Sequence, residues 1–115
     1  GMLGTTFGGN HLACSASLAV LEIIKKDKLQ HHAKSMETYF RAKAEKIKGI
    51  KIKGRGLMLG LAFDFEVGPL RKSLIYEKNI FTGGSSNKNV LRILPPLTVQ
   101  KKHFDRFFEA LEDLL

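Results

Sequence analysis

GTTFGGN, at residues 4–10, is followed at once by a long apolar run that begins at His11. Three glycines in seven residues let the backbone reach positive φ, and Asn10 stands where a helix N-cap belongs. The stretch therefore predicts a tight loop that leads into a capped helix. The first N–H groups of a helix have no partner within it, so the nearby hydroxyls of Thr5 and Thr6 are also typical of an anion-binding site. On spacing alone, both interpretations stay open.

Two long helices are predicted in the first half of the chain. The first follows Asn10 and is so apolar that two of its faces need cover, with Cys14 expected as a small buried hydrophobic side chain. We expect this helix to bridge toward a further domain, which leaves its outer face exposed here or covered by another copy. The second helix runs from about Leu29 to Lys48 and ends at Gly49, a residue free to adopt positive φ.

Alternating or apolar runs predict four strands, at residues 50–53, 57–65, 80–82 and 90–94. Between the first two, GRG at residues 54–56 is interpreted as a hairpin turn or bulge and not as a phosphate cradle, because no helix follows it. Along the second strand, large apolar side chains alternate with a face that carries Gly60 and Ala62. Small residues on that face predict that a helix packs closely against it.

Two further helices complete the expected fold. A short one opens at Gly68 with Pro69 in its first turn. Thr98 is predicted to cap the last one, whose apolar stripe includes Phe104 and Phe108. The order α-α-β-β-α-β-β-α predicts an α+β fold: a small, mainly antiparallel sheet with helices packed on one face.

The composition is basic. The 115 residues include 19 Lys and Arg against 11 Asp and Glu, a net charge of +8. A lysine-coated surface and a nucleic-acid footprint both explain this excess, and the spread of the lysines over several elements favours the first. No apolar run approaches the roughly 20 residues that cross a bilayer, so no membrane partner is expected.

Cysteine and histidine give no sign of a metal site. A single cysteine rules out a disulfide framework and is typical of the reducing cytoplasm. His31 and His32 are adjacent, so they point in different directions and are poorly placed to share a metal ion. We expect two surface histidines.

Three stretches, in this order along the chain, resemble motifs of the class III (ornithine-type) pyridoxal-phosphate aminotransferases. They are GTTFGGN at residues 4–10, GRGLMLG at 54–60 and NVLRILPPL at 89–97. With similar helical segments between them they cover almost the whole chain, and the resemblance is closest to the acetylornithine aminotransferase branch. Many relatives have His and Pro where this chain has Leu3 and His11, two positions that shape the ends of the loop.

The resemblance implies that this chain corresponds only to the C-terminal part of such an enzyme. Residues 1–27 would form the cofactor-phosphate loop and a helix linking toward a missing large domain. Residues 28–115 would form the C-terminal small domain of a fold-type I aminotransferase. In the family, the lysine that binds pyridoxal 5'-phosphate covalently lies upstream, and no lysine here stands in a matching motif. No catalytic residue and no bound cofactor are therefore expected in this chain, which should be inactive alone.

The resemblance also assigns binding roles. It implies that Thr6 donates its hydroxyl to the cofactor phosphate across a homodimer interface, with Thr5 and Gly4 flanking the site, and that Arg92 binds a substrate carboxylate. The complete cytoplasmic enzyme would transfer the terminal amine of N-acetylornithine or N-succinylornithine to 2-oxoglutarate in arginine biosynthesis. Small molecules would be its substrates, without nucleic acid.

Two alternatives remain open. A guanidinium in mid-strand among aliphatic neighbours must find an anion or reach water, so Arg92 is equally typical of an ion pair with a carboxylate of this domain or of the missing one. The whole chain is also compatible with a stand-alone basic α+β module that binds nucleic acid through Lys51, Lys53 and Arg55 at a sheet edge. It lacks the aromatic pairs on a sheet face that readers of single-stranded RNA use for stacking.

Overall fold

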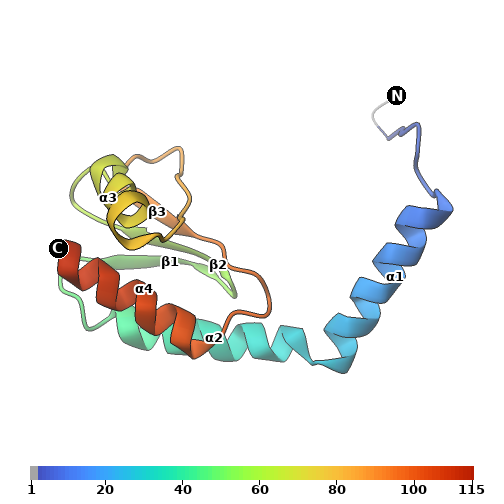
Figure 1. Ribbon diagram of the computed structural model, residues 1–115, viewed down its shortest axis with the longest axis horizontal. Helices are drawn as coiled ribbons and strands as arrows, with labels where there is room; N and C mark the ends of the chain where they lie inside the picture. The colour runs from blue at the N-terminus through green and yellow to red at the C-terminus, as the bar shows by residue number, and fades with distance from the viewer. Residues whose placement is uncertain (1–2) are drawn as a thin grey trace. The chain divides into compact units, whose positions relative to one another are not determined.

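The computed structural model describes residues 3–115. The chain divides into two compact units after Gln30, an N-terminal unit and a C-terminal unit that begins at His31 (Figure 1). The functional boundary expected between residues 27 and 28 stays a prediction. Each unit is described by itself below, and the role of the first as a cofactor loop with a linking helix stays a prediction.

The N-terminal unit contains a loop, helix α1 (His11–Lys26) and the first two residues of the next helix. The predicted cap is confirmed: Asn10 Oδ1 accepts a hydrogen bond from the Ala13 backbone N–H at 2.9 Å. No residue of α1 is buried, and the apolar side chain of Leu12 is 83% exposed. Its apolar face is thus uncovered, as expected. The prediction that Cys14 is buried is wrong in this chain: Cys14 is exposed, because none of the residues described in this unit covers α1.

Helix α2 (Leu29–Ala44) is shorter than predicted. Its buried stripe contains Met36, Phe40 and Ala44, which confirms the predicted periodicity. After Ala44 the chain forms tight turns of the i to i+3 type, such as Ile47 N–H to Ala44 C=O at 3.1 Å, which end the α-helix before Lys48. Gly49 then adopts the expected positive φ of 85°.

The sheet has three antiparallel strands in the order β1 (Lys51–Arg55), β2 (Met58–Ala62) and β3 (Val90–Ile93). The predicted fourth strand at residues 80–82 is wrong. The segment is tied to helix α3 (Gly68–Lys78) instead: Ile80 N–H donates to Leu74 C=O at 2.8 Å, and the Arg71 guanidinium donates to Thr82 C=O at 3.2 Å. Only Gly83 reaches the sheet, where it forms a single antiparallel bridge with Arg92.

The turn between β1 and β2 is a hairpin, as predicted. Gly54 and Gly56 have φ of 92° and 57°, in the left-handed region that favours glycine. The Gly56 N–H donates to Glu37 Oε2 at 2.7 Å, while Glu37 Oε1 accepts from Arg41 Nε at 2.9 Å and Arg41 also donates to Gly54 C=O. A carboxylate already occupies the place that a phosphate would need, so this turn is no phosphate cradle.

One face of the sheet carries the core. Leu59 pairs with Ile93 and Leu61 with Leu91, so their side chains share a face, and all four are buried. Helices α2, α3 and α4 (Lys101–Leu114) contribute most of the other core residues, with Phe40 of α2 against Phe104, Phe107 and Phe108 of α4. The connecting segments add Leu57, Phe63, Val67 and Val99. The fold is α+β with helices on one face of a small antiparallel sheet, as expected.

Three details of this unit differ from expectation. Among residues 3–115, the nearest neighbours of a Cβ on Gly60 come from strands and not from a helix: they are Val90, Leu91 and Lys53. Thr98 does not cap α4, because a turn from Pro96 to Val99 intervenes and makes Gln100 the cap residue. His32 is not a simple surface histidine, since its Nε2 lies 2.6 Å from the Val99 carbonyl oxygen.

Candidate functional site

Arg92 lies in the middle of β3, on the sheet face opposite the core. It pairs with Gly60 of β2 on one side and with Gly83 on the other, so it stands between two residues without side chains. Arg92 is exposed. The Arg92 side chain packs against Gly83: a Cβ added to Gly83 would lie 2.6 Å from Arg92 Nε and 3.2 Å from Arg92 Cζ.

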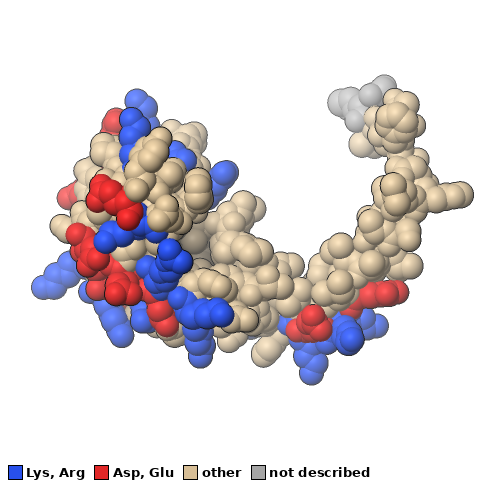
Figure 2. Space-filling view, in the orientation of Figure 1, with Lys and Arg blue, Asp and Glu red and all other residues tan. Residues whose placement is uncertain are grey.

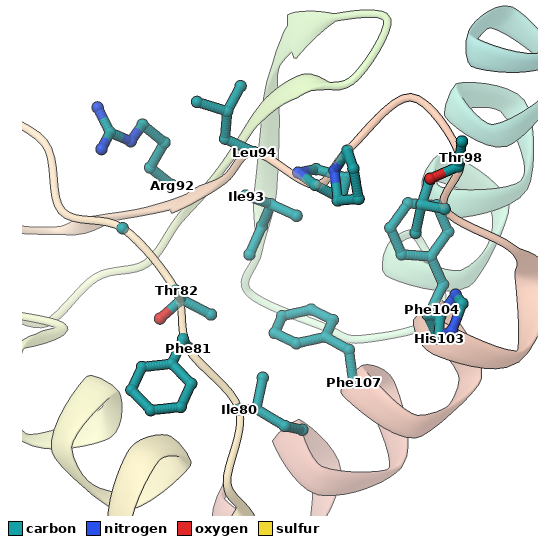
Figure 3. Close-up of a pocket in the computed structure, with 14 residues that line it drawn as sticks. Ile80, Phe81, Thr82, Arg92, Ile93, Leu94, Thr98, His103, Phe104 and Phe107 are labelled. Atoms are coloured by element: carbon teal, nitrogen blue, oxygen red, sulfur yellow. The ribbon is translucent and has the colours of Figure 1, made fainter. Parts of the chain in front are cut away.

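An apolar pocket of about 620 Å³ begins beside Arg92. Ile80, Ile93 and Phe107 point toward one another in it, whereas the Arg92 guanidinium points away from them at the edge (Figure 3). The other lining residues come from the segment before β3, the proline turn and the start of α4: Phe81, Thr82, Gly83, Leu94, Pro95, Pro96, Thr98, Val99, His103 and Phe104. The site thus combines apolar walls with one cation.

Among residues 3–115, Arg92 forms no ion pair. The four ion pairs join Arg41 to Glu37, Lys43 to Asp105, Lys78 to Asp113 and Lys88 to Glu66. A pairing of Arg92 with a carboxylate of this domain is therefore not supported. A guanidinium without an ion-pair partner keeps its planar set of N–H donors available. Such a set binds a carboxylate through two parallel hydrogen bonds.

Arg71 and Gly83 are parts of this site that sequence reasoning missed. Arg71 Nη2 donates to Thr82 C=O at 3.2 Å, and Gly83 exchanges two backbone hydrogen bonds with Arg92, at 2.9 and 3.0 Å. Within the described chain, Arg71 Nε and Thr82 Oγ1 are buried without a hydrogen-bond partner. No periodicity or motif signals these contacts, because they join α3, a loop and β3.

Thr6 begins a turn of the N-terminal unit and Thr5 directly precedes it, and both are exposed. Neither hydroxyl takes part in a hydrogen bond with the residues that the structure describes. The Thr5 methyl group packs where a Gly8 side chain would be, so Gly8 lets the loop fold back on itself. Thr5 and Thr6 belong to the N-terminal unit, whereas Arg92 belongs to the C-terminal unit. The binding roles expected for all three residues stay predictions.

Lys51, Lys53 and Arg55 are exposed along the edge strand β1, as the nucleic-acid alternative requires. Figure 2 shows that Asp and Glu are interspersed with Lys and Arg on the visible face of the C-terminal unit. This view shows no single-sign surface of the kind that nucleic-acid footprints need.

Neither a metal site nor a membrane span emerges from the described residues. Residues 3–115 contain no cluster of three or more His, Cys, Asp or Glu side chains suited to a metal ion. Across the same range, every helix is too short or too polar to traverse a bilayer.

Comparison with known proteins identifies the family. The family model for aminotransferase class-III matches residues 1–115. The chain belongs to the class-III aminotransferases. Over the full 115 residues of this chain, it is 41% identical to the acetylornithine aminotransferase of Aquifex aeolicus. Over 96% of this chain, it is 40% identical to the acetylornithine aminotransferase of Methanocaldococcus jannaschii. An ornithine aminotransferase from Exiguobacterium is 33% identical.

Solved structures of aminotransferases have the same fold. The ornithine aminotransferase of Toxoplasma gondii matches 99% of this chain with a TM-score of 0.82 and 27% identity. The acetylornithine aminotransferase of Elizabethkingia anophelis matches 98% with a TM-score of 0.78 and 26% identity. The chain spans only about 30% of the length of these relatives.

Proposed function

We propose that this chain is the C-terminal part of a pyridoxal-phosphate-dependent aminotransferase of arginine biosynthesis. The complete enzyme would transfer the terminal amine of N-acetylornithine, or of N-succinylornithine, to 2-oxoglutarate. The observation that carries the proposal is Arg92, an exposed guanidinium without an ion-pair partner among the described residues, in a class-III aminotransferase chain. The acetylornithine donor is supported by the names of the 41% and 40% identical relatives.

The loop at residues 4–10 suits the phosphate of the cofactor. A phosphate needs hydrogen-bond donors, and the hydroxyls of Thr5 and Thr6 are exposed and have no partner within residues 3–115. Thr6 would donate to the phosphate, with Thr5 beside it. Pyridoxal phosphate, when bound, supplies the electron sink for amino-group transfer, and the protein supplies placement and charge.

The catalytic lysine would come from outside this chain. We infer that two copies of the complete protein form a cytoplasmic homodimer in which Thr6 of one copy serves the cofactor of the other. Alone, the 115-residue chain would be inactive. Within this chain, Thr6 would then bind the cofactor and Arg92 would orient the substrate.

Arg92 would hold a carboxylate of 2-oxoglutarate through two parallel hydrogen bonds. The planar guanidinium of arginine donates one hydrogen bond to each oxygen of a carboxylate. The ammonium group of lysine is a compact charge on a flexible side chain and lacks this planar geometry. In the complete enzyme, Arg92→Lys should therefore lower kcat/KM for 2-oxoglutarate by about 10²-fold, which corresponds to about 2.7 kcal/mol. Urea unfolding should change little.

Arg106→Lys is the matched control, because Arg106 is exposed on α4 and takes part in no ion pair among residues 3–115. It should leave both kcat/KM and stability unchanged. Near-normal kcat/KM for Arg92→Lys, together with a large loss of stability, would make Arg92 a structural residue. The proposal would also fail if the reading frame that precedes Gly1 encoded no cofactor-binding domain.

A further inference from the structure

Gly83 occupies a position at which any side chain would displace the Arg92 guanidinium. We propose that Gly83 is a positioning residue: the space left by its missing side chain fixes where the Arg92 guanidinium lies and thereby orients the carboxylate that it binds. The last step rests on the proposed function of Arg92. The placement itself rests on geometry alone.

The steric requirement is direct. A Cβ on Gly83 would lie 2.6 Å from Arg92 Nε, 3.1 Å from Nη2 and 3.2 Å from Cζ. Contacts below 3.0 Å are not sustained by real Cβ atoms, so one of the two groups must move. The Arg92 side chain is the flexible partner, and it would leave its place against the backbone.

Backbone conformation does not require glycine at this position. Gly83 is absent from the residues with positive φ, in contrast to Gly54 and Gly56 in the hairpin turn. Alanine could adopt the backbone angles of Gly83 without strain. The contact with Arg92 is therefore the specific reason for a glycine here.

The backbone beside the Arg92 guanidinium is held by hydrogen bonds to two elements, β3 and α3. Gly83 N–H donates to Arg92 C=O at 2.9 Å, and Arg92 N–H donates to Gly83 C=O at 3.0 Å. In addition, Arg71 of α3 donates to Thr82 C=O at 3.2 Å, and its Nη1 would lie 3.0 Å from a Cβ on Gly84. Residues 82–84 are thus anchored both to β3 and to α3, and these contacts oppose a shift of the loop away from Arg92.

Gly60 provides the matched control on the opposite side of Arg92. It is the β2 partner of Arg92, as Gly83 is its partner on the other edge. A Cβ on Gly60 would lie 3.0 Å from Val90 Cγ1, and no Arg92 atom is among its nearest neighbours. Gly60→Ala therefore adds the same methyl group next to the same arginine without touching the guanidinium.

Placement is tested on the 115-residue chain by NMR of the arginine Nε–H groups. In Gly83→Ala, the Arg92 Nε–H resonance should shift and its ¹H–¹⁵N heteronuclear NOE should fall, because the Arg92 side chain can no longer pack against the backbone at residue 83. In Gly60→Ala, both should stay near the parent values. An unchanged Arg92 Nε–H signal in Gly83→Ala overturns the proposal, as does an equal change in both variants.

The consequence for carboxylate binding is tested on the complete enzyme with glutarate as a probe. Loss of one of two charge-assisted hydrogen bonds predicts a glutarate Kd about tenfold higher in Gly83→Ala. In the Arg92→Ala background, Gly83→Ala should have no further effect, which a double-mutant cycle measures. An additive effect in that background would refute the positioning role. If Arg92→Ala itself left the glutarate Kd unchanged, the proposed carboxylate-binding function of Arg92 would be refuted. The NMR experiment would still test separately whether Gly83 positions the Arg92 guanidinium.

Discussion

Glu37→Gln tests whether one carboxylate holds the β1–β2 hairpin onto α2. In the structure, Glu37 Oε2 accepts from Gly56 N–H at 2.7 Å and Oε1 accepts from Arg41 Nε at 2.9 Å. Glutamine keeps the shape of the side chain but has one acceptor oxygen and an NH₂ group. It can serve only one of the two donors, and its NH₂ group then faces the other.

The expected loss follows from these two hydrogen bonds. Hydrogen bonds to charged groups contribute about 1.5–3 kcal/mol each. The side chains of Glu37 and Arg41 are 20% and 31% exposed, so solvent screens part of this contribution. We expect Glu37→Gln to lower the free energy of unfolding by about 1–2 kcal/mol at pH 7, a urea midpoint roughly 0.5–1 M lower.

The loss should depend on pH in a defined direction. The hydrogen bond from Gly56 holds the pKa of the Glu37 carboxyl below its usual value of 4.5, and the Arg41 guanidinium acts in the same direction. A lowered folded-state pKa means that the stabilisation is fully present above about pH 4.5 and disappears as the pH falls through the folded-state pKa. The difference between parent and Glu37→Gln should therefore shrink steadily at acidic pH.

Urea unfolding of the 115-residue chain at pH 7 and pH 3 measures both effects. Glu109→Gln is the control, because Glu109 is exposed on α4 and has no ion pair among residues 3–115. It should change the midpoint little at either pH. No loss in Glu37→Gln at pH 7 would show that the hairpin is held by other contacts. A loss of equal size at both pH values would show that the charge of Glu37 is not responsible.

Two further substitutions test the hairpin and the threonine loop. Gly54→Ala should destabilise the chain by at least about 2 kcal/mol in urea unfolding, because Gly54 has a φ of 92° and its Cβ would overlap the Met58 carbonyl oxygen. Gly68→Ala, at an open site, should change stability much less, and similar losses in both would contradict the argument. In the complete enzyme, Thr6→Val should raise the Kd for pyridoxal phosphate about tenfold to a hundredfold in equilibrium dialysis. An unchanged Kd would mean that Thr6 is only a loop residue.

Features that depend on neighbouring residues can be predicted from the amino-acid sequence. The Asn10 cap of α1 and the stripe of Phe104 and Phe108 on α4 follow from hydrogen bonds and periodicities within one turn or one helix. Resemblance added the candidate residues Thr6 and Arg92. Even so, the end of α2 was misplaced, because the i to i+3 turns after Ala44 compete closely with another helical turn.

Tertiary structure alone decided how segments distant in sequence meet. Residues 80–82 have the composition of a strand, yet hydrogen bonds to α3 hold them off the sheet, and only Gly83 bridges β3. His32 adjoins His31 and is expected at the surface, yet its Nε2 lies 2.6 Å from the carbonyl oxygen of Val99, 67 positions along the chain. The packing of Gly83 under Arg92 depends on strand register and on a loop anchored by Arg71. Local propensity carries no information on such contacts, since their free energy exists only once the chain has brought the partners together.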